Sequence, residues 1–270
     1  MNYHDITLEI EDPVAVIRLN RPDKLNAFTL DTLHEIRAAV GAAVADPRVV
    51  GIVITGNGRG FCAGLDTDAL AAATADASAW QADSAAHADL PGIFSYLLET
   101  PKPVIAAVNG VAAGGGLVLT LMCDLRFAAA SASFVTIFLK RGLIAEHGAS
   151  WVLPRLVGTG HALDLLWMSD RIDAQTARDL GLVEKLCTDD DVLEMACDYV
   201  RRLAVTSSPA AIAETKRLVY RHLGTHYVQA LQEADRAQLR FVGLPDAQEG
   251  ARALLEKRAP RFPRLGGDDD

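Results

Sequence analysis

The stretch Val108-Asn109-Gly110-Val111-Ala112-Ala113-Gly114-Gly115-Gly116 runs directly into a wholly apolar segment, residues 117–123. Glycine lets the backbone approach a ligand closely and adopt dihedral angles that other residues avoid. A helix that begins at these glycines leaves backbone N–H groups unpaired and directed at whatever lies before the helix. Such donors stabilise negative charge that develops on an oxygen atom. Taken alone, the stretch fits an oxyanion-binding turn and an ordinary turn before a buried helix equally well.

Two further blocks lie upstream of this stretch. Residues 58–66 (Gly-Arg-Gly-Phe-Cys-Ala-Gly-Leu-Asp) follow an apolar segment, and residues 20–27 read Asn-Arg-Pro-Asp-Lys-Leu-Asn-Ala. In this order and at these separations, the three blocks resemble those of the crotonase superfamily, the enoyl-CoA hydratase and isomerase family. The resemblance covers nearly the whole chain, from about Val14 to Arg258. It implies an α/β protein with the ClpP/crotonase-like spiral of β-β-α repeats, a C-terminal helical trimerisation region and an acyl-CoA substrate.

The composition sets limits on other functions. The chain has 270 residues, half of them hydrophobic, and a formal net charge of -9, which disfavours nucleic acid or an anionic membrane as a general partner. The four cysteines form no CxxC pair, so we expect neither a disulfide framework nor a zinc site. We see no signal peptide and no apolar run long enough to span a bilayer, and therefore expect a cytoplasmic protein.

Apolar periodicity predicts the order of the elements. Strands are expected at residues 6–10, 14–19, 51–55, 103–108, 125–128, 133–136 and 182–186. Helices are expected at residues 30–44, 117–123, 162–168, 174–180, 191–204, 209–222, 227–241 and 247–257. Residues 68–87, rich in alanine and small polar residues, are interpreted as a mobile helical lid or a loop.

The domain organisation follows from this order. We expect a crotonase-fold core with the acyl-CoA site at residues 1–200 and a C-terminal helical region for oligomerisation and pocket cover at 201–265. Residues 266–270 form an acidic tail that we expect to be frayed. The resemblance implies assembly as a homotrimer or a homohexamer.

The resemblance also implies roles for particular residues. The peptide N–H groups of Leu65 and Gly115 would hold the thioester oxygen as an enolate forms, without depending on side-chain chemistry. Relatives contact coenzyme A at the positions of Lys24, Ala27, Ala63, Gly64 and Asp66, and a C-terminal lysine, here Lys257, reaches a CoA phosphate. For Lys24 and Lys257, the alternative is an ordinary solvated lysine.

The chain departs from the hydratases of this family where they carry two water-holding glutamates. The first position is occupied here by Val118 and the second by Phe138. These apolar side chains can neither take nor deliver a proton. We therefore expect Val118 and Phe138, together with Gly114, to line the substrate pocket, and we do not expect the usual hydratase chemistry.

A carboxylate occurs nearby in Gly142-Leu143-Ile144-Ala145-Glu146-His147-Gly148. Some isomerases of the family carry an acid in a similar pattern, where one group moves a proton between two carbons of an enolate. One carboxylate suffices for this reaction, because the same group removes and returns the proton. An acid near a helix start can also be purely structural, since it interacts favourably with the helix dipole.

The favoured function is double-bond isomerisation of an acyl-CoA, with Glu146 as acid and base. The alternatives are a 2-enoyl-CoA hydratase of fatty-acid β-oxidation, with Glu146 acting alone on water, and a non-catalytic acyl-CoA binding protein. No separate cofactor or metal is expected, because coenzyme A is part of the substrate. Asp124, at the end of the apolar helix, is interpreted as a structural carboxylate. Residues 58–63 formally match a dinucleotide fingerprint, but the context does not support NAD binding.

Overall fold

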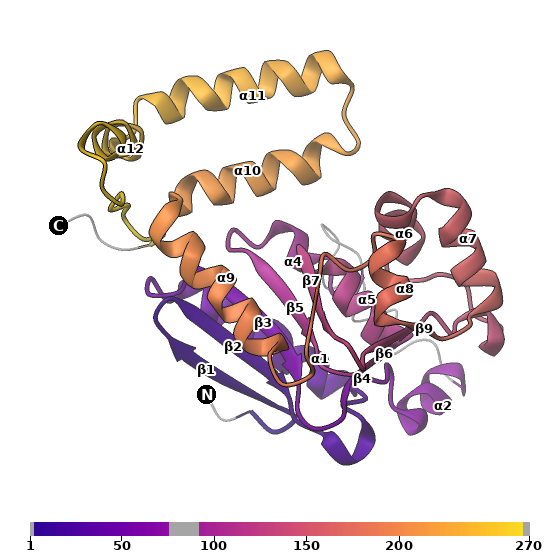
Figure 1. The fold of residues 1–270 in the computed structure, drawn as a ribbon. Coiled ribbons are helices and arrows are strands. Elements are labelled where there is room, and N and C mark those ends of the chain that lie inside the picture. The colour runs from indigo at the N-terminus through magenta and orange to yellow at the C-terminus, as the bar shows by residue number, and fades with distance from the viewer. Residues whose placement is uncertain (1–2, 76–91, 267–270) are drawn as a thin grey trace.

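Two β-sheets form the centre of the computed structural model, which describes residues 3–75 and 92–266 (Figure 1). In the six-stranded sheet, β1 and β2 are antiparallel and the other neighbours are parallel. Its order is β1 (Ile6–Glu11), β2 (Val14–Leu19), β3 (Gly51–Gly56), β5 (Val104–Val108), β7 (Leu125–Ala129) and β10 (Lys185–Cys187). The four-stranded sheet has the order β4 (Gly60–Cys62), β6 (Val111–Ala113), β8 (Ser133–Val135) and β9 (Ile172–Asp173).

The order of strands shows a repeated β-β-α unit. In each of the pairs β3–β4, β5–β6 and β7–β8, the first strand joins the large sheet and the second joins the small one. The three units are arranged in the same order in both sheets, and their neighbouring strands run parallel. The expected spiral of β-β-α repeats is therefore confirmed.

Helices cover the sheets on the outside, as expected for parallel strands buried on both faces. α1 packs on β1 and β2, and α9 packs across β3, β5 and β7. The helices before the C-terminal region are α1 (Leu30–Ala45), α2 (Thr67–Ala75), α4 (Tyr96–Glu99), α5 (Gly115–Met122), α6 (Ala149–Val157), α7 (Thr159–Met168), α8 (Ala174–Asp179) and α9 (Val192–Thr206). Two short 3₁₀ helices are η1 (Pro22–Lys24) and η2 (Leu139–Arg141).

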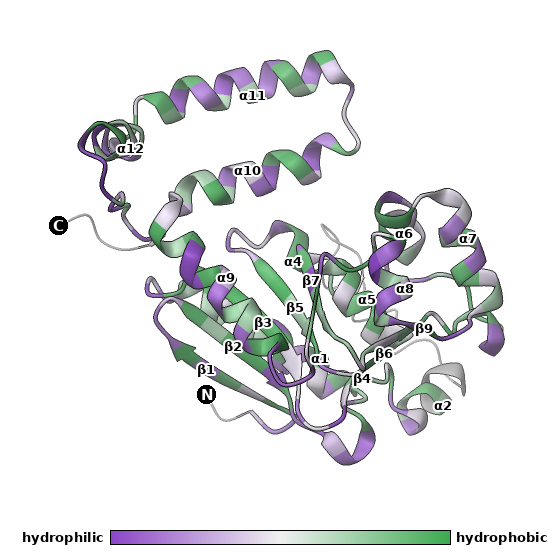
Figure 2. Ribbon diagram, viewed as in Figure 1, coloured by the Kyte–Doolittle hydropathy of each residue, from purple (hydrophilic) through white to green (hydrophobic). Residues whose placement is uncertain are grey.

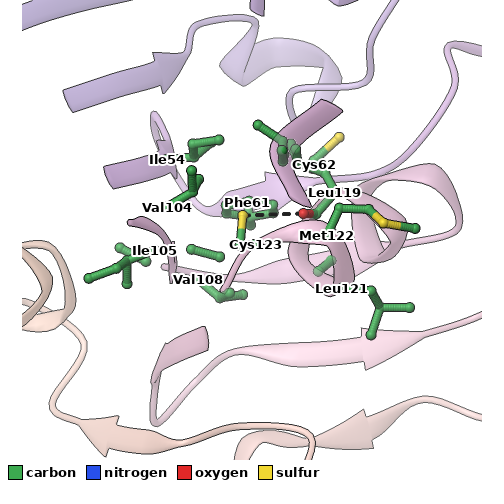
Figure 3. Close-up of a cluster of buried hydrophobic side chains, with 14 of the residues drawn as sticks. Ile54, Phe61, Cys62, Val104, Ile105, Val108, Leu119, Leu121, Met122 and Cys123 are labelled. Carbon is green, nitrogen blue, oxygen red and sulfur yellow. Dashed lines mark hydrogen bonds between the residues drawn. The ribbon is translucent and has the colours of Figure 1, made fainter. Parts of the chain in front are cut away.

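The apolar segment after the glycines forms α5, which lies in the centre of the core. It is buried on every side from Gly116 to Met122, as its sequence without charges predicts. Figure 3 shows Leu119, Met122 and Cys123 near Phe61 and Cys62 of β4. The Cys123 thiol donates to the Leu119 carbonyl at 3.3 Å. The tight packing holds the start of this helix in a fixed position relative to β4.

Three helices form an arm that projects from the core (Figure 1): α10 (Pro209–His222), α11 (Tyr227–Val242) and α12 (Pro245–Glu256). α9 continues through residue 200 to Thr206, so the expected boundary at 200/201 falls inside a helix. The arm carries mixed apolar and polar surfaces (Figure 2). Exposed apolar side chains of the arm are Val219, Leu223, Tyr227, Val228, Leu231, Leu239, Val242, Leu254 and Leu255.

A buried ion pair joins the arm to the core. The Lys216 ammonium of α10 donates to Asp124 Oδ2 at 2.7 Å and to the Leu97 carbonyl at 2.9 Å. The same carboxylate accepts the Val104 N–H at 2.7 Å and the Tyr220 hydroxyl at 2.9 Å. The interpretation of Asp124 as a structural carboxylate is thus confirmed, and its hydrogen bonds connect α5, β5 and α10.

We expect Lys216→Met to lower the free energy of unfolding by about 3 kcal/mol, because it leaves a half-buried carboxylate without its cation. The Lys216 side chain is 9% exposed. The matched control is Lys140→Met, which breaks an exposed pair with Asp170 and should cost less than about 1 kcal/mol. Denaturant unfolding of both variants measures the difference. If the two variants lose the same free energy of unfolding, burial does not increase the cost of breaking the Lys216–Asp124 pair.

Most of the expected elements are confirmed, with small differences at their ends. The strands β4, β6 and β9 and the helices α4 and α6 were not predicted. Strands of two or three residues carry no readable period-two signal. The expected strand at 182–186 begins later, at Lys185. Of the expected lid at 68–87, residues 68–75 belong to α2, and residues 76–87 lie outside the described residues.

Candidate active site

The two glycine-rich turns meet at Gly64. This residue has φ +91°, and a Cβ atom on it would lie 2.7 Å from the Ala113 carbonyl oxygen and 3.2 Å from the Gly115 nitrogen. Both the dihedral angle and the contact require glycine. The turn after β4 is therefore packed directly against the start of α5 at Gly64.

Two backbone donors are available at this contact. Within the described residues, neither the Leu65 N–H nor the Gly115 N–H donates to an oxygen atom. Gly115 is the first residue of α5, where the partial positive charge of the helix dipole favours an anion. A Cβ atom at Gly115 would lie 2.5 Å from Cζ of Phe28, so the helix start rests on that ring. This geometry suits an oxygen that gains negative charge.

Two asparagine side chains hold residues 56–60, just before and within the first glycine-rich turn, and neither was singled out from the sequence. Asn26, which has φ +56°, donates from Nδ2 to the carbonyls of Asn57 at 2.9 Å and Gly60 at 2.8 Å. Asn109 accepts the Gly56 N–H at 3.1 Å and donates to the Gly58 carbonyl at 2.9 Å. The available signal was Asn26 itself, because asparagine tolerates the left-handed region better than most residues.

The residues expected at coenzyme A lie around the same turn. Lys24, at the end of η1, is exposed, and Ala27 is buried three residues later. The Ala63 N–H donates to the Leu25 carbonyl at 2.9 Å, which brings this block against the turn. The structure therefore gathers Lys24, Ala27, Ala63 and Gly64 into one region.

Asp66 has a structural role within this region. Its Oδ1 accepts the Asp68 N–H at 3.1 Å in the first turn of α2, and its Oδ2 accepts from Arg21 at 3.2 Å. The pKa of Asp66 lies below its ordinary value, first because of the Asp68 N–H and then because of the Arg21 charge. Arg21 belongs to the block at residues 20–27, but its sequence context predicted no function for it.

Glu146 lies in the turn between η2 and α6, and its carbonyl accepts the Ala149 N–H at 3.0 Å. Its side chain is 38% exposed, and its Oε2 lies 3.9 Å from Nε2 of His147. Burial lowers the pKa of His147, so its imidazole is neutral at pH 7, although the Glu146 charge opposes this shift. His147 has φ +53°, an unusual backbone conformation beside the candidate acid.

The residues at the two glutamate positions are buried and apolar. Val118 lies in the first turn of α5 and is fully buried, and Phe138, just before η2, is 4% exposed. Gly114 precedes α5 with φ +51°, and a Cβ atom there would lie 3.1 Å from Cγ2 of Ile137. No carboxylate is present at either glutamate position.

Lys257 lies away from the other expected site residues of its own chain. It ends α12 with φ +54° and is exposed. Figure 1 shows α12 in the arm beside the C-terminal end, well separated from α5. Because Lys257 directly follows α12, it does not lie beside the start of α5 in its own chain.

Other kinds of site find no support in the described parts of the chain. Over residues 3–75 and 92–266, no cluster of three or more His, Cys, Asp or Glu side chains could hold a metal ion. Nor does any helix in these two ranges combine the length and apolar character needed to cross a membrane.

Comparisons with known proteins agree with this geometry. A family model described as enoyl-CoA hydratase/isomerase matches residues 9–264. The chain is 37% identical over 264 residues to a crotonyl-CoA hydratase of Syntrophomonas wolfei, covering 97% of this chain and 99% of that protein. It is 32% identical over 260 residues to a 1,2-epoxyphenylacetyl-CoA isomerase of Escherichia coli, covering 95% and 97%.

Solved structures extend the comparison to three dimensions. The crystal structure of an enoyl-CoA hydratase from Bacillus anthracis matches with a TM-score of 0.88 and 30% sequence identity. The match covers 98% of this chain and 100% of that one. The similarity therefore includes the core, the paired turns and the C-terminal helices.

Proposed function

Because this chain belongs to the enoyl-CoA hydratase/isomerase family, we propose that it isomerises the double bond of an enoyl-CoA thioester. It is an enzyme of this family that acts on an acyl-CoA. The observation that supports isomerisation is the combination of a paired backbone-donor site with Val118 and Phe138 at the positions of the two water-holding glutamates. Glu146 is then the acid and base.

The reaction begins with binding of a 3-enoyl-CoA, whose thioester oxygen accepts the N–H groups of Leu65 and Gly115. The Glu146 carboxylate removes a proton from C2, and the electron pair moves into the carbonyl to form a dienolate. The two donors and the start of α5 stabilise its negative charge. Protonated Glu146 then delivers the proton to C4, which leaves the conjugated 2-enoyl-CoA and restores the carboxylate.

Hydration of a 2-enoyl-CoA is the second candidate, and the similarity to a crotonyl-CoA hydratase favours it. It requires a group that holds and activates water. Glu146 would have to do so alone, because Val118 and Phe138 cannot hydrogen-bond to water. Comparing the rates on a 3-enoyl-CoA and on crotonyl-CoA distinguishes the two reactions. Much faster conversion of the 3-enoyl-CoA supports isomerisation, and faster hydration contradicts it.

The same proposal covers the binding of coenzyme A. Lys24, Ala27 and Ala63 would contact the CoA moiety, which enters as part of the substrate and needs no separate cofactor. Lys257 would reach the phosphate of CoA bound to a neighbouring subunit, because the arm carries it away from its own turns. We also propose that the protein is located in the cytoplasm.

Assembly as a homotrimer or homohexamer is supported by the arm. Ion pairs join α10 to α11, since Glu233 accepts from Arg217 at 3.0 Å and from Arg221 at 2.7 Å. The apolar side chains of the arm, among them Val228, Leu239 and Leu255, are exposed in one chain. Burying such a surface against other copies would stabilise the assembly.

We expect the protein to sediment as a trimer or hexamer at micromolar concentration. Replacing Val228 and Leu239 of α11 by lysine should shift it towards smaller species, because charge is then placed on the apolar surface. Replacing the exposed Leu163 and Met168 of α7, outside residues 201–265, by lysine serves as the control. Analytical ultracentrifugation measures the change. A wild-type protein that sediments as a monomer contradicts the proposed assembly.

A further inference from the structure

A short two-stranded ladder sets the direction of the Leu65 N–H. Phe28 pairs with Leu65 as a parallel bridge, in which the Phe28 N–H donates to the Gly64 carbonyl at 2.9 Å and the Asp66 N–H donates to the Phe28 carbonyl at 3.0 Å. In a parallel ladder the flanking residues make the bonds, so the N–H of the middle residue points to the opposite edge. The Leu65 N–H is therefore turned away from Phe28.

The Arg21 guanidinium connects the two strands of this ladder. Nη1 donates to the Ala27 carbonyl on one strand, and Nη2 donates to Asp66 Oδ2 on the other at 3.2 Å. The Asp5 carboxylate also lies near this guanidinium, with its Oδ1 3.7 Å from Nε of Arg21. The Arg21 side chain is only 21% exposed. A planar guanidinium can hold two acceptors at a fixed angle, which a lysine ammonium cannot do.

We propose that Arg21 is a positioning residue for the oxyanion site, and that its contacts with Ala27 and Asp66 fix the direction of the Leu65 N–H. This inference rests on the proposed function of that N–H. Arg21 acts on the backbone of residues 64–66 through Asp66, which follows Leu65 directly. Small displacements of a catalytic group can slow a reaction by about 10²-fold, so the orientation of this donor matters.

The inference gives Asp66 a different role from direct contact with coenzyme A. Its two oxygens are occupied by Arg21 and by the Asp68 N–H. If Asp66 positions the turn, its loss should affect the chemical step. If it contacted coenzyme A, its loss would weaken substrate binding. Likewise, an Arg21 that bound a CoA phosphate would change KM rather than kcat.

The test uses Arg21→Gln, Asp66→Asn and their double mutant, each made in the 270-residue chain. We expect kcat for a 3-enoyl-CoA to fall by about 10- to 100-fold in each, with KM changed less than about twofold. The double mutant should be no slower than the slower single variant, because each single change already breaks the contact between Arg21 and Asp66. Arg48→Gln, which breaks an exposed pair with Asp46, is the matched control and should leave kcat unchanged.

A spectroscopic measurement reports on the donor directly. A bound 3-aryl-2-enoyl-CoA absorbs at longer wavelength when hydrogen bonds polarise its carbonyl. We expect this red shift in the wild type and in Arg48→Gln, and a smaller shift in Arg21→Gln. Arg21→Lys keeps the charge but cannot hold both acceptors, so it should lie between the two. It also provides a folded variant if thermal melting shows that Arg21→Gln is unfolded.

Three results would overturn the inference: a raised KM with unchanged kcat, additive losses in the double mutant, or a full red shift in both Arg21 variants. Failure of the proposed function gives a different result. In that case the wild type itself shows no red shift, and the oxyanion assignment is rejected together with the role of Arg21.

Discussion

Removing the Gly115 N–H should slow isomerisation by about 10²–10³-fold, the loss typical for one oxyanion donor. Proline is the suitable replacement, because it lacks the N–H and its φ angle fits the first position of a helix. Any side chain at position 115 also meets the Phe28 ring, since a Cβ atom would lie 2.5 Å from Cζ. Gly115→Pro alone would therefore combine two effects.

The comparison should be made in a Phe28→Leu background, which relieves the contact. There, Gly115→Ala adds a Cβ atom and keeps the N–H, whereas Gly115→Pro removes the N–H. The ratio of their kcat/KM values for a 3-enoyl-CoA measures the donor alone. Circular dichroism and thermal melting establish that both variants are folded. Equal activity of folded alanine and proline variants would reject Gly115 as an oxyanion donor.

Glu146→Gln should reduce isomerisation by about 10²–10⁴-fold, the range for loss of a general acid or base. Glutamine keeps the size and hydrogen bonding of the side chain but cannot exchange a proton. The affinity for an acyl-CoA, measured by calorimetry, should remain nearly the same. Glu9→Gln, at an exposed position on β1, is the matched control and should retain full activity.

The same variant tests the second candidate reaction. If the wild type hydrates crotonyl-CoA rapidly and Glu146→Gln does so as well, another residue holds the water and the proposed isomerase mechanism is wrong. If both activities are lost together, Glu146 acts in both. Slow hydration by the wild type, together with loss of isomerisation in the variant, is the result that we expect.

Local patterns were sufficient to predict much of the fold. Alternating or continuous apolar residues identified β1, β2, β3 and β5, and helical spacing identified α1 and α9 to α12. These signals are readable because burial of one face or one stripe repeats along the chain. β4 and β6 were missed, because they are short and their partners lie in other repeats.

In the candidate site too, some features could be read from the sequence and others could not. The turns that contain Gly64 and Gly115 were identifiable, because clustered glycines in the sequence mark a turn or a close approach of the backbone. The contact of Arg21 with Asp66 was not, since the two residues are separated by 45 positions and any carboxylate could have been the partner. The sequence likewise did not identify Lys216 as the partner of Asp124, because the two residues are 92 positions apart.

The sequence by itself determined the family, most of the longer strands and helices, the two glycine-rich turns and the apolar character of Val118 and Phe138. These properties depend on residue type and on spacing along the chain. Only the tertiary structure decided that Asp66 faces Arg21, that the ladder turns the Leu65 N–H outwards, and that Lys257 lies far from its own paired turns. The physical reason is that such contacts depend on how the repeats stack and where the arm projects, which no short stretch of sequence specifies.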